Sequence, residues 1–223
     1  PDVALISRFT KHERVLVTGA GGSIGSELCR QLIRLNPDLL VFLEISEYAL
    51  YQLQENLESL ALEFKIECPK LVYLLGSVQD VVLLDSIFEK YQPQLVFHAA
   101  AYKHVPLVES NIIAGIQNNV FGSLNIAEMA IKYRIKQLVL VSTDKAVRPT
   151  NVMGASKRVA ELIFQAFQDD AVCDTRFSIV RFGNVLGSSG SVIPKFQKQI
   201  ESGGPITVTH PDVTRYFMTT PEA

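Results

Sequence analysis

Short apolar runs alternate with longer stretches of helical periodicity along most of this chain of 223 residues. The runs are rich in β-branched and aromatic residues, which is typical of buried strands. Six of them stand out: Val15–Thr18, Leu39–Glu44, Leu71–Leu75, Leu95–His98, Gln137–Ser142 and Phe177–Phe182. Strands and helices in regular alternation predict an α/β fold with a doubly wound parallel sheet of the Rossmann kind.

The stretches between the runs carry apolar residues at helical spacing. After the first run, the predicted apolar helix face consists of Ile24, Leu28, Leu32 and Leu35. After the second run, it consists of Leu50, Leu53, Leu57, Leu60 and Phe64. Ser46 is suited to cap the second of these helices, and Asp80 is suited to cap another after the third run.

The alternation ends near Asn184, where the composition changes. Glycine and serine crowd residues 183–191, and the short apolar run 206–209 stands apart from the earlier pattern. We expect two parts: residues 1–183 form the sheet domain, and residues 184–223 begin a small, incomplete lobe that contacts substrate. The chain starts at Pro1, and Pro221 is suited to open a helix just before the sequence stops, so we expect a fragment cut at both ends.

A glycine-rich turn joins the first predicted strand to the first predicted helix. Gly19, Gly22 and Gly25 fall where such a turn tightens, where a pyrophosphate approaches the backbone, and where the helix packs on the strand. Ser23 and Ile24 open the helix, whose N-terminus offers N–H donors and a positive dipole to a phosphate. The context predicts a dinucleotide site, and a glycine turn without a ligand is the alternative.

Glu44 ends the second run at the distance where an acid binds the adenosine ribose of a dinucleotide. A carboxylate there repels a 2′-phosphate, so NAD is favoured over NADP; the alternative is a solvated acid at a strand end. The fourth run is followed by Ala99, Ala100, Ala101 and then Lys103. Residues this small allow a cofactor to lie against the backbone, although they also suit helix packing.

The densest group of chemically active side chains follows the fifth run, between Ser142 and Lys157. Thr143, Asp144 and Lys145 emerge where an open α/β sheet places its ligands. Neighbouring side chains on a regular strand point to opposite faces, so we expect the backbone to leave strand geometry there if both Asp144 and Lys145 meet one substrate. For Lys157 the alternative is an ordinary solvated helix lysine, and for Thr143 it is β-propensity.

Composition excludes several classes of protein. The net charge of −2 and the lack of a basic tail argue against a nucleic-acid binder. Cysteine occurs three times without a C-x-x-C pair, and His98 and His104 lack partners at metal-ligand spacing, so we expect no metal and a reducing, cytoplasmic environment. No apolar run approaches the ~20 residues that span a bilayer.

Several motifs together carry a family resemblance. They read T-G-A-G-G-S-I-G-S-E, A-A-A-Y-K-H-V-P-L-V-E, N-N-V-F-G, S-T-D-K-A-V-R-P-T-N-V-M-G-A-S-K, R-F-G-N-V-L-G-S-S-G-S-V and T-R-Y-F-M-T. The sequence resembles the extended short-chain dehydrogenase/reductases that act as nucleotide-sugar 4,6-dehydratases, above all their bacterial polysaccharide-biosynthesis branch. The likeness covers nearly the whole chain.

This resemblance implies an NAD-dependent enzyme acting on UDP-N-acetylglucosamine, as a homo-oligomer. It oxidises the sugar at C4, eliminates water across C5 and C6, and returns the hydride to C6. The long members of the branch carry N-terminal membrane helices, so the resemblance places a longer parent at the cytoplasmic face of the bacterial inner membrane. Retention or inversion at C5 stays open.

The resemblance also assigns roles within the reaction segment. Asp144 is the acid for the departing C6 hydroxyl, Lys145 is the base at C5, and Lys157 holds the nicotinamide ribose. The family's usual catalytic tyrosine is Met153 in this sequence, as in the long membrane-associated members. A thioether cannot accept a proton from a hydroxyl, so the C4 proton goes either to Thr143 with a water or to Asp144.

Other contacts are predicted by resemblance and by charge. Ser77 and Val78 stand at a position that commonly touches adenine, although family members often have an acid in place of Ser77. Asn119 is expected to position the catalytic segment beside the cofactor through backbone hydrogen bonds, or to be an ordinary polar helix residue. The candidates for binding the UDP-sugar are Lys103, Arg181, Asn184, Ser191 and Arg215.

Two competing functions remain at this point. A nucleotide-sugar 4-epimerase shares the fold and the cofactor but needs no acid and base at C5 and C6, so the Asp144–Lys145 pair argues against it. A non-catalytic NAD-binding regulator explains the missing tyrosine, but the retained Lys157 argues against that function.

Overall fold

The computed structural model describes residues 9–64, 69–169, 174–187, 192–208, 210, 212, 214 and 216–219. Its strands are β1 (Arg14–Thr18), β2 (Leu39–Glu44), β3 (Lys70–Leu75), β4 (Leu95–His98), β5 (Gln137–Thr143), β6 (Arg176–Phe182), β7 (Asn184–Val185) and β8 (Phe217–Met218). Its α-helices are α2 (Ser23–Leu32), α3 (Glu47–Phe64), α4 (Val81–Tyr91), α5 (Val105–Ser110), α6 (Ile112–Ile116), α7 (Gly122–Lys132), α8 (Val152–Gln168) and α9 (Val192–Glu201). Three further turns are helical: η1 (Ile33–Leu35), the π-helical η2 (Gln117–Phe121) and η3 (Asp144–Ala146).

The main sheet has six strands in the order β3-β2-β1-β4-β5-β6, and all its neighbouring pairs are parallel. This order confirms the predicted doubly wound Rossmann sheet, and the predicted strand bounds differ from the observed ones by no more than one residue. The strand order reverses between β1 and β4. A crevice therefore opens beyond the carboxyl ends of these two strands, where such folds bind ligands.

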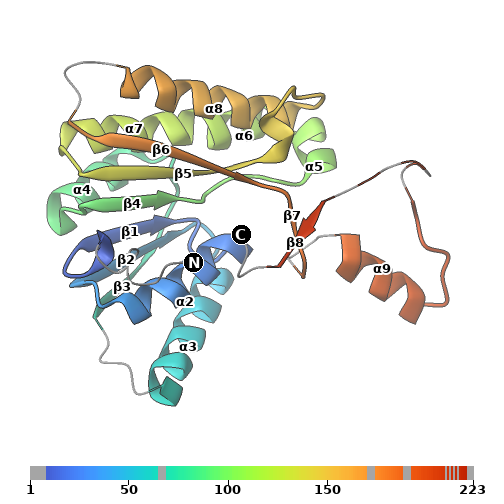
Figure 1. Ribbon diagram of the computed structural model, residues 1–223, viewed down its shortest axis with the longest axis horizontal. Coiled ribbons are helices and arrows are strands. Elements are labelled where there is room, and N and C mark those ends of the chain that lie inside the picture. Colours follow the sequence, from blue (N-terminus) through green and yellow to red (C-terminus); the bar gives the residue numbers. More distant parts are fainter. Residues whose placement is uncertain are drawn as a thin grey trace.

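Helices cover both faces of the sheet (Figure 1). Helices α2 and α3 pack on one face, where the core includes Val15, Phe42, Leu53 and Leu57. Helices α4, α7 and α8 cover the other face, where the core includes Leu16, Leu138, Ile126 and Phe164. Successive side chains of a strand thus pack alternately into two separate hydrophobic cores, one on each face, as expected for a sheet covered by helices on both sides.

Helix α2 packs differently from the prediction. Its buried residues are Gly25, Cys29 and Leu32, whereas Ile24 and Leu28 are only half-buried. The helix approaches the sheet closely through Gly25, so the buried stripe passes through a residue without a side chain. The predicted face was therefore wrong in its position around the helix, and Ile24 is left to line the site described below.

The two predicted helix caps are confirmed. Ser46 Oγ accepts a hydrogen bond of 3.3 Å from the backbone N–H of Ala49. The carboxylate of Asp80 accepts one of 2.9 Å from the N–H of Leu83. These side chains satisfy backbone donors that the first turn of a helix otherwise leaves unpaired.

Beyond β6 the chain leaves the main sheet, and α9 with the small parallel sheet of β7 and β8 lies beyond the carboxyl edge (Figure 1). The run 206–208 is not a strand, and Thr209 lies outside the described residues. Among the residues that the structure describes, no helix is long and apolar enough to cross a lipid bilayer.

Candidate functional site

A cavity of about 1060 Å³ opens at the carboxyl edge of the sheet. It joins the glycine turn, the segment after β4, the end of β5, helix α8 and the chain beyond β6. Its cationic lining residues are Lys103, Lys145 and Lys157. Within the part of the chain that the structure describes, no Asp or Glu lines it. A cavity of this size and charge suits anionic ligands.

The glycine turn is built for close approach of the backbone. Gly19 has a φ of +66°, and a Cβ on it would lie 2.6 Å from the Cα of Ala100. A Cβ on Gly25 would lie 2.0 Å from the carbonyl oxygen of Gly19. Gly22, Ser23, Ile24 and Gly25 line the cavity, with Gly22 at the N-cap of α2. This N-terminus therefore faces the cavity as the sequence predicted, and it can receive a phosphate group.

Glu44 supports this turn from β2. One carboxylate oxygen accepts a hydrogen bond of 2.9 Å from the N–H of Gly21, and the other accepts one of 3.0 Å from the N–H of Ser46. The side chain is buried and does not line the cavity. The structure thus gives Glu44 a role in shaping the turn, and its contact with a ribose stays a prediction.

The reaction segment leaves strand geometry at the predicted place. Strand β5 ends at Thr143, and the turn η3 follows at once. Thr143 Oγ1 donates a hydrogen bond of 3.0 Å to the carboxylate of Asp144 and accepts one of 3.3 Å from the N–H of Lys145. Both Thr143 and Lys145 line the cavity.

Asp144 and Lys145 form an ion pair. Lys145 Nζ donates to the Asp144 carboxylate at 3.0 Å and to the side-chain oxygen of Asn184 at 3.1 Å. Partial burial raises the pKa of Asp144, but the hydrogen bonds from Lys145 and Thr143 outweigh it and hold that pKa below its ordinary value. Because 47% of the Asp144 side chain is exposed, water stabilises the charged form of the pair.

Helix α8 presents two predicted site residues to the cavity, Met153 and, one turn later, Lys157. Only 4% of Lys157 is exposed, and this burial lowers its pKa to about 8, against an opposing effect of the Glu161 carboxylate. A lysine buried this far is not the solvated helix residue that the sequence left as an alternative. It is a cation held at the wall of the cavity.

Asn119 makes backbone hydrogen bonds, but with the segment after β4 rather than with the catalytic segment, which it contacts through the side chain of Ser156. Its side-chain oxygen accepts from the N–H of Tyr102 at 2.8 Å, and its side-chain nitrogen donates to the Tyr102 carbonyl at 2.9 Å and to Ser156 Oγ at 3.0 Å. It lies in the π-helical turn η2, a distortion frequent at functional sites. Asn119 fixes the segment after β4 against α8 and does not itself line the cavity.

His98 stands at the end of β4 in a buried chain of hydrogen bonds. Ser123 Oγ donates to the carbonyl of Asn119 at 2.7 Å, so it accepts from His98 Nε2 at 2.9 Å. Nδ1 then accepts from the hydroxyl of Thr18 at 2.7 Å. Burial, aided by the charge on Lys157, lowers the pKa of His98 to about 3, so the ring is neutral and structural.

This burial predicts a pH-dependent stability. The unfolded chain protonates His98 near its ordinary pKa of 6.5, whereas the folded protein resists protonation down to about 3, so stability falls as pH drops below 6.5. Replacing His98 with glutamine will reduce the slope of unfolding free energy against pH between these values, by at most about 1.4 kcal/mol per pH unit. Urea unfolding at several pH values measures it, and an unchanged slope would contradict the assignment.

The remaining predicted cofactor contacts fall into two groups. Ala99, Ala101 and Lys103 line the cavity, and burial lowers the pKa of Lys103. Ala100 packs instead against Gly19. Ser77 and Val78 lie away from the cavity lining: Ser77 Oγ accepts from the N–H of Gln79, and Val78 is buried. The contacts of Ser77 and Val78 with adenine therefore stay predictions.

The predicted substrate residues are placed unequally. Asn184 lines the cavity, while Ser191 and Arg215 lie outside the described residues. Arg181 does not line the cavity, because its guanidinium binds Glu161 through Nε at 2.7 Å and Nη2 at 2.5 Å. This geometry gives no support to a contact between Arg181 and a diphosphate.

Sequence reasoning missed Glu161, whose side chain is fully buried beside the reaction segment. It also missed the apolar part of the cavity wall, which includes Leu107, Val192, Phe196 and Phe217. One signal could have found Glu161: with Lys157, it interrupts the apolar stripe of α8 formed by Met153, Ala160 and Phe164. Two charges on a buried helix face indicate a paired, functional environment.

The described residues bring together no group of three or more His, Cys, Asp or Glu side chains able to hold a metal ion.

Comparison with known proteins agrees with this arrangement. The chain is 50% identical over 222 residues to the capsular polysaccharide biosynthesis protein CapD of Staphylococcus aureus, covering 100% of this chain and 36% of CapD. Pen from Bacillus thuringiensis, a solved structure, matches with a TM-score of 0.86 at 35% identity, over 96% of this chain and 66% of Pen. DesIV of Streptomyces venezuelae, a dTDP-glucose 4,6-dehydratase solved with NAD bound, matches in fold with a TM-score of 0.79 at 24% identity, over 94% and 69% of the two chains.

The protein is a short-chain dehydrogenase/reductase. It has the parallel sheet in this order, a glycine turn where the strand order reverses, and Lys157 of α8 facing the same cavity. More specifically, the family model for polysaccharide biosynthesis proteins matches residues 15–223, and the chain belongs to that family. It spans about a third of the length of CapD, since it covers 36% of that protein.

Proposed function

We propose that this protein is an NAD-dependent 4,6-dehydratase that converts UDP-N-acetylglucosamine into a 4-keto-6-deoxy UDP-sugar for surface polysaccharide synthesis. One observation carries the proposal. A single cavity holds the glycine turn together with Thr143, Lys145 and Lys157, and its described lining is cationic without any carboxylate. That arrangement suits two phosphate-bearing ligands, a dinucleotide and a sugar nucleotide. Their reacting groups would lie beside the hydroxyl of Thr143 and the amine of Lys145.

The residues present fit a dinucleotide. The turn around Gly19 and Gly25 leaves space that any Cβ would fill, and the N-terminus of α2 faces the same space. We assign Lys157 to the nicotinamide ribose and the charge of Glu44 to the rejection of a 2′-phosphate, which favours NAD over NADP. NAD, when bound, supplies the acceptor and later the donor for the hydride of the sugar.

Elimination needs a base at C5 and an acid at C6, and the Asp144–Lys145 pair holds one proton between two groups 3.0 Å apart. The Asp144 carboxylate is ionised in the pair, so that proton is on Lys145. A bound substrate excludes water, and burial disfavours both charges, so the proton moves to Asp144. The amine of Lys145 then takes the C5 proton, and the acid of Asp144 protonates the departing C6 hydroxyl. The net charge of the pair does not change.

Thr143 is the group we assign to the C4 hydroxyl. Met153 cannot take its proton, and Asp144 already carries the proton meant for the C6 oxygen, whereas Thr143 lines the cavity and offers a hydroxyl. The Thr143 hydroxyl passes the C4 proton to a water, because Asp144 already holds the proton that came from Lys145. Asp144 then protonates the departing C6 oxygen, Lys145 returns its proton to C5, and the pair takes one proton back from water at the end of the turnover.

Incubating the full chain with UDP-N-acetylglucosamine and NAD tests this function, with NMR to identify the product. We expect a 4-keto-6-deoxy UDP-sugar, with solvent deuterium at C5 when the reaction runs in heavy water. A C4 epimer would indicate an epimerase instead, and unchanged sugar with tight NAD binding would indicate a regulator. The same spectra decide between retention and inversion at C5.

Location and assembly follow from the resemblance alone and remain proposals. We place a longer parent protein at the cytoplasmic face of the bacterial inner membrane, anchored by a region outside this sequence. Self-association into a homo-oligomer belongs to the same proposal.

A further inference from the structure

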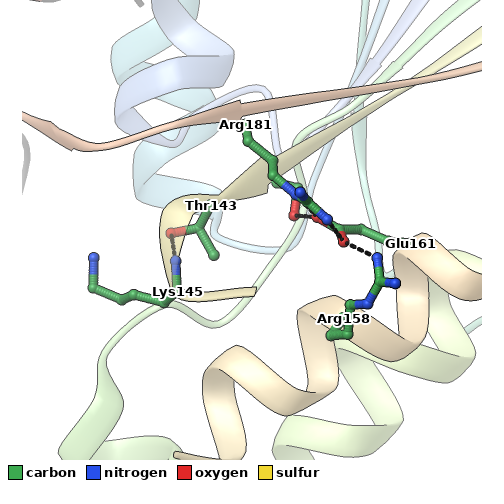
Figure 2. A network of polar contacts seen from close by, with 6 residues as sticks. Thr143, Lys145, Arg158, Glu161 and Arg181 are labelled. Carbon is green, nitrogen blue, oxygen red and sulfur yellow. Dashed lines mark hydrogen bonds and ion pairs between the residues drawn. The ribbon is translucent and has the colours of Figure 1, made fainter. Parts of the chain in front are cut away.

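A cluster of charges around one buried carboxylate lies behind the reaction segment (Figure 2), and its charged members Arg158, Glu161 and Arg181 do not line the cavity. The Glu161 carboxylate is its centre. One oxygen accepts from Ser142 Oγ at 2.6 Å and from Arg181 Nε at 2.7 Å. The other accepts from Arg181 Nη2 at 2.5 Å and from Arg158 Nη1 at 3.0 Å. Four donors therefore satisfy this carboxylate.

These contacts join three elements that each carry part of the cavity wall. Ser142 and Arg181 are directly paired residues of β5 and β6, while Glu161 and Arg158 belong to α8. Each contact lies in or next to the cavity lining: Ser142 itself lines the cavity, Arg181 precedes the lining residue Phe182, and Glu161 lies one turn after Lys157. A movement of Glu161 would therefore change the spacing between Lys157 and the ends of both strands.

The charge of Glu161 also acts on Lys157 at the cavity wall. Burial alone would raise the pKa of Glu161, but the hydrogen bonds from Arg181, Ser142 and Arg158 outweigh it and lower that pKa to about 2. The carboxylate is thus ionised at any working pH. Its negative charge favours the ammonium form of Lys157 and opposes the effect of burial on that lysine.

We propose that Glu161 is a positioning residue of this site, which holds α8 against the ends of β5 and β6 and so fixes Lys157 relative to Thr143 and Lys145. The catalytic consequence rests on the proposed function, but the effect on Lys157 does not. A bidentate guanidinium and a hydroxyl from two neighbouring strands converge on one carboxylate, which is a rigid geometry for such a joint. Arg181 thereby acts through Glu161 rather than on a substrate phosphate.

Glu161→Gln in the full chain tests this role because it preserves shape and removes the charge. We expect the midpoint for acetylation of Lys157, measured by competitive labelling and mass spectrometry without ligand, to fall by about one pH unit below the wild-type value. Two guanidinium groups then remain near Lys157 without their counter-ion. A merely structural loss would loosen the fold and move the midpoint upward, towards the ordinary value of 10.5.

Turnover supplies the second measurement. With UDP-N-acetylglucosamine we expect kcat to fall about 10- to 100-fold with little change in KM, because the reacting groups are displaced rather than the binding groups removed. Adding Arg181→Gln to Glu161→Gln removes the extra positive charge, so the midpoint should return towards that of the wild type. If the single variant fails to fold, Arg181→Lys, which keeps the charge and loses the two-point contact, must still lower kcat.

Glu13→Gln is the matched control, since Glu13 also binds a cationic side chain, that of Lys136, but does not line the cavity. It should leave the Lys157 midpoint and kcat unchanged. The proposal is overturned if Glu161→Gln leaves the midpoint unchanged or raises it, or if a folded Arg181→Lys variant keeps full kcat. If the wild type does not convert the UDP-sugar, the proposed function fails, and the midpoint experiment still decides the role of Glu161.

Discussion

Replacing Asp144 with asparagine will stop the loss of water from UDP-N-acetylglucosamine while leaving the C5 proton exchangeable. An amide cannot give a proton to the departing C6 hydroxyl, and loss of a positioned acid lowers a rate about 10²- to 10⁴-fold. Lys145 and Thr143 remain. Without the carboxylate that stabilises its charge, Lys145 gives its proton to water as the bound substrate dries the site, so oxidation at C4 and removal of the C5 proton continue. In heavy water, mass spectrometry of the recovered sugar nucleotide should show deuterium at C5 without a deoxy product.

The companion variant Lys145→Met should lose the exchange as well as the product, because it lacks the base. Asp85→Asn serves as the control, since Asp85 binds Lys132 at 2.5 Å far from the cavity and should retain both. Normal dehydration by Asp144→Asn would refute the assignment of the acid. Absence of deuterium in that variant would instead assign the first proton transfer to Asp144.

Replacing Thr143 with valine will abolish both dehydration and exchange at C5. Valine matches threonine in shape but offers no oxygen to the C4 hydroxyl, and without the C4 ketone the C5 proton is not acidic. We expect a loss of about 10²-fold or more in kcat. The measurement is again deuterium in the recovered sugar nucleotide, with a melting curve to verify that the variant folds.

Thr143→Val and Asp144→Asn therefore separate the first proton transfer from the second. Deuterium in the asparagine variant but not in the valine variant assigns the C4 step to Thr143. Substantial exchange in Thr143→Val would show that a water or another group performs this step, and that the cavity position of Thr143 has no catalytic meaning.

The sheet could be predicted from the sequence because its central strands β1, β2 and β4 are buried on both sides. A run such as Leu39–Glu44 is apolar at successive positions, and all six of its residues are indeed buried. The departure from strand geometry after Thr143 was predictable for a chemical reason, since two adjacent side chains were required on one side. Features that depend on neighbouring residues in the sequence, such as the buried strand and the turn after Thr143, could therefore be predicted.

Contacts between distant residues were not predictable in the same way. An arginine such as Arg181 suits a phosphate and a carboxylate equally well, and its actual partner, Glu161, is 20 residues away on another element. The face of α2 was missed because its closest contact with the sheet is made by Gly25, which contributes nothing to an apolar pattern. The side-chain type of Arg181 determines which groups it can bind, and the packing of α8 against β6 determines that it binds Glu161.

The hydrogen-bonded chain from Thr18 through His98 and Ser123 to Asn119 has a consequence for how such proteins diverge. Each member satisfies a buried neighbour, so a single change leaves another polar group without a partner, at a cost of about 1–3 kcal/mol. These positions are therefore expected to vary together or not at all. Among related proteins, we expect these four residues to be retained or replaced together. Residues of the cavity wall such as Leu107 and Phe196 can instead change with the sugar that is bound.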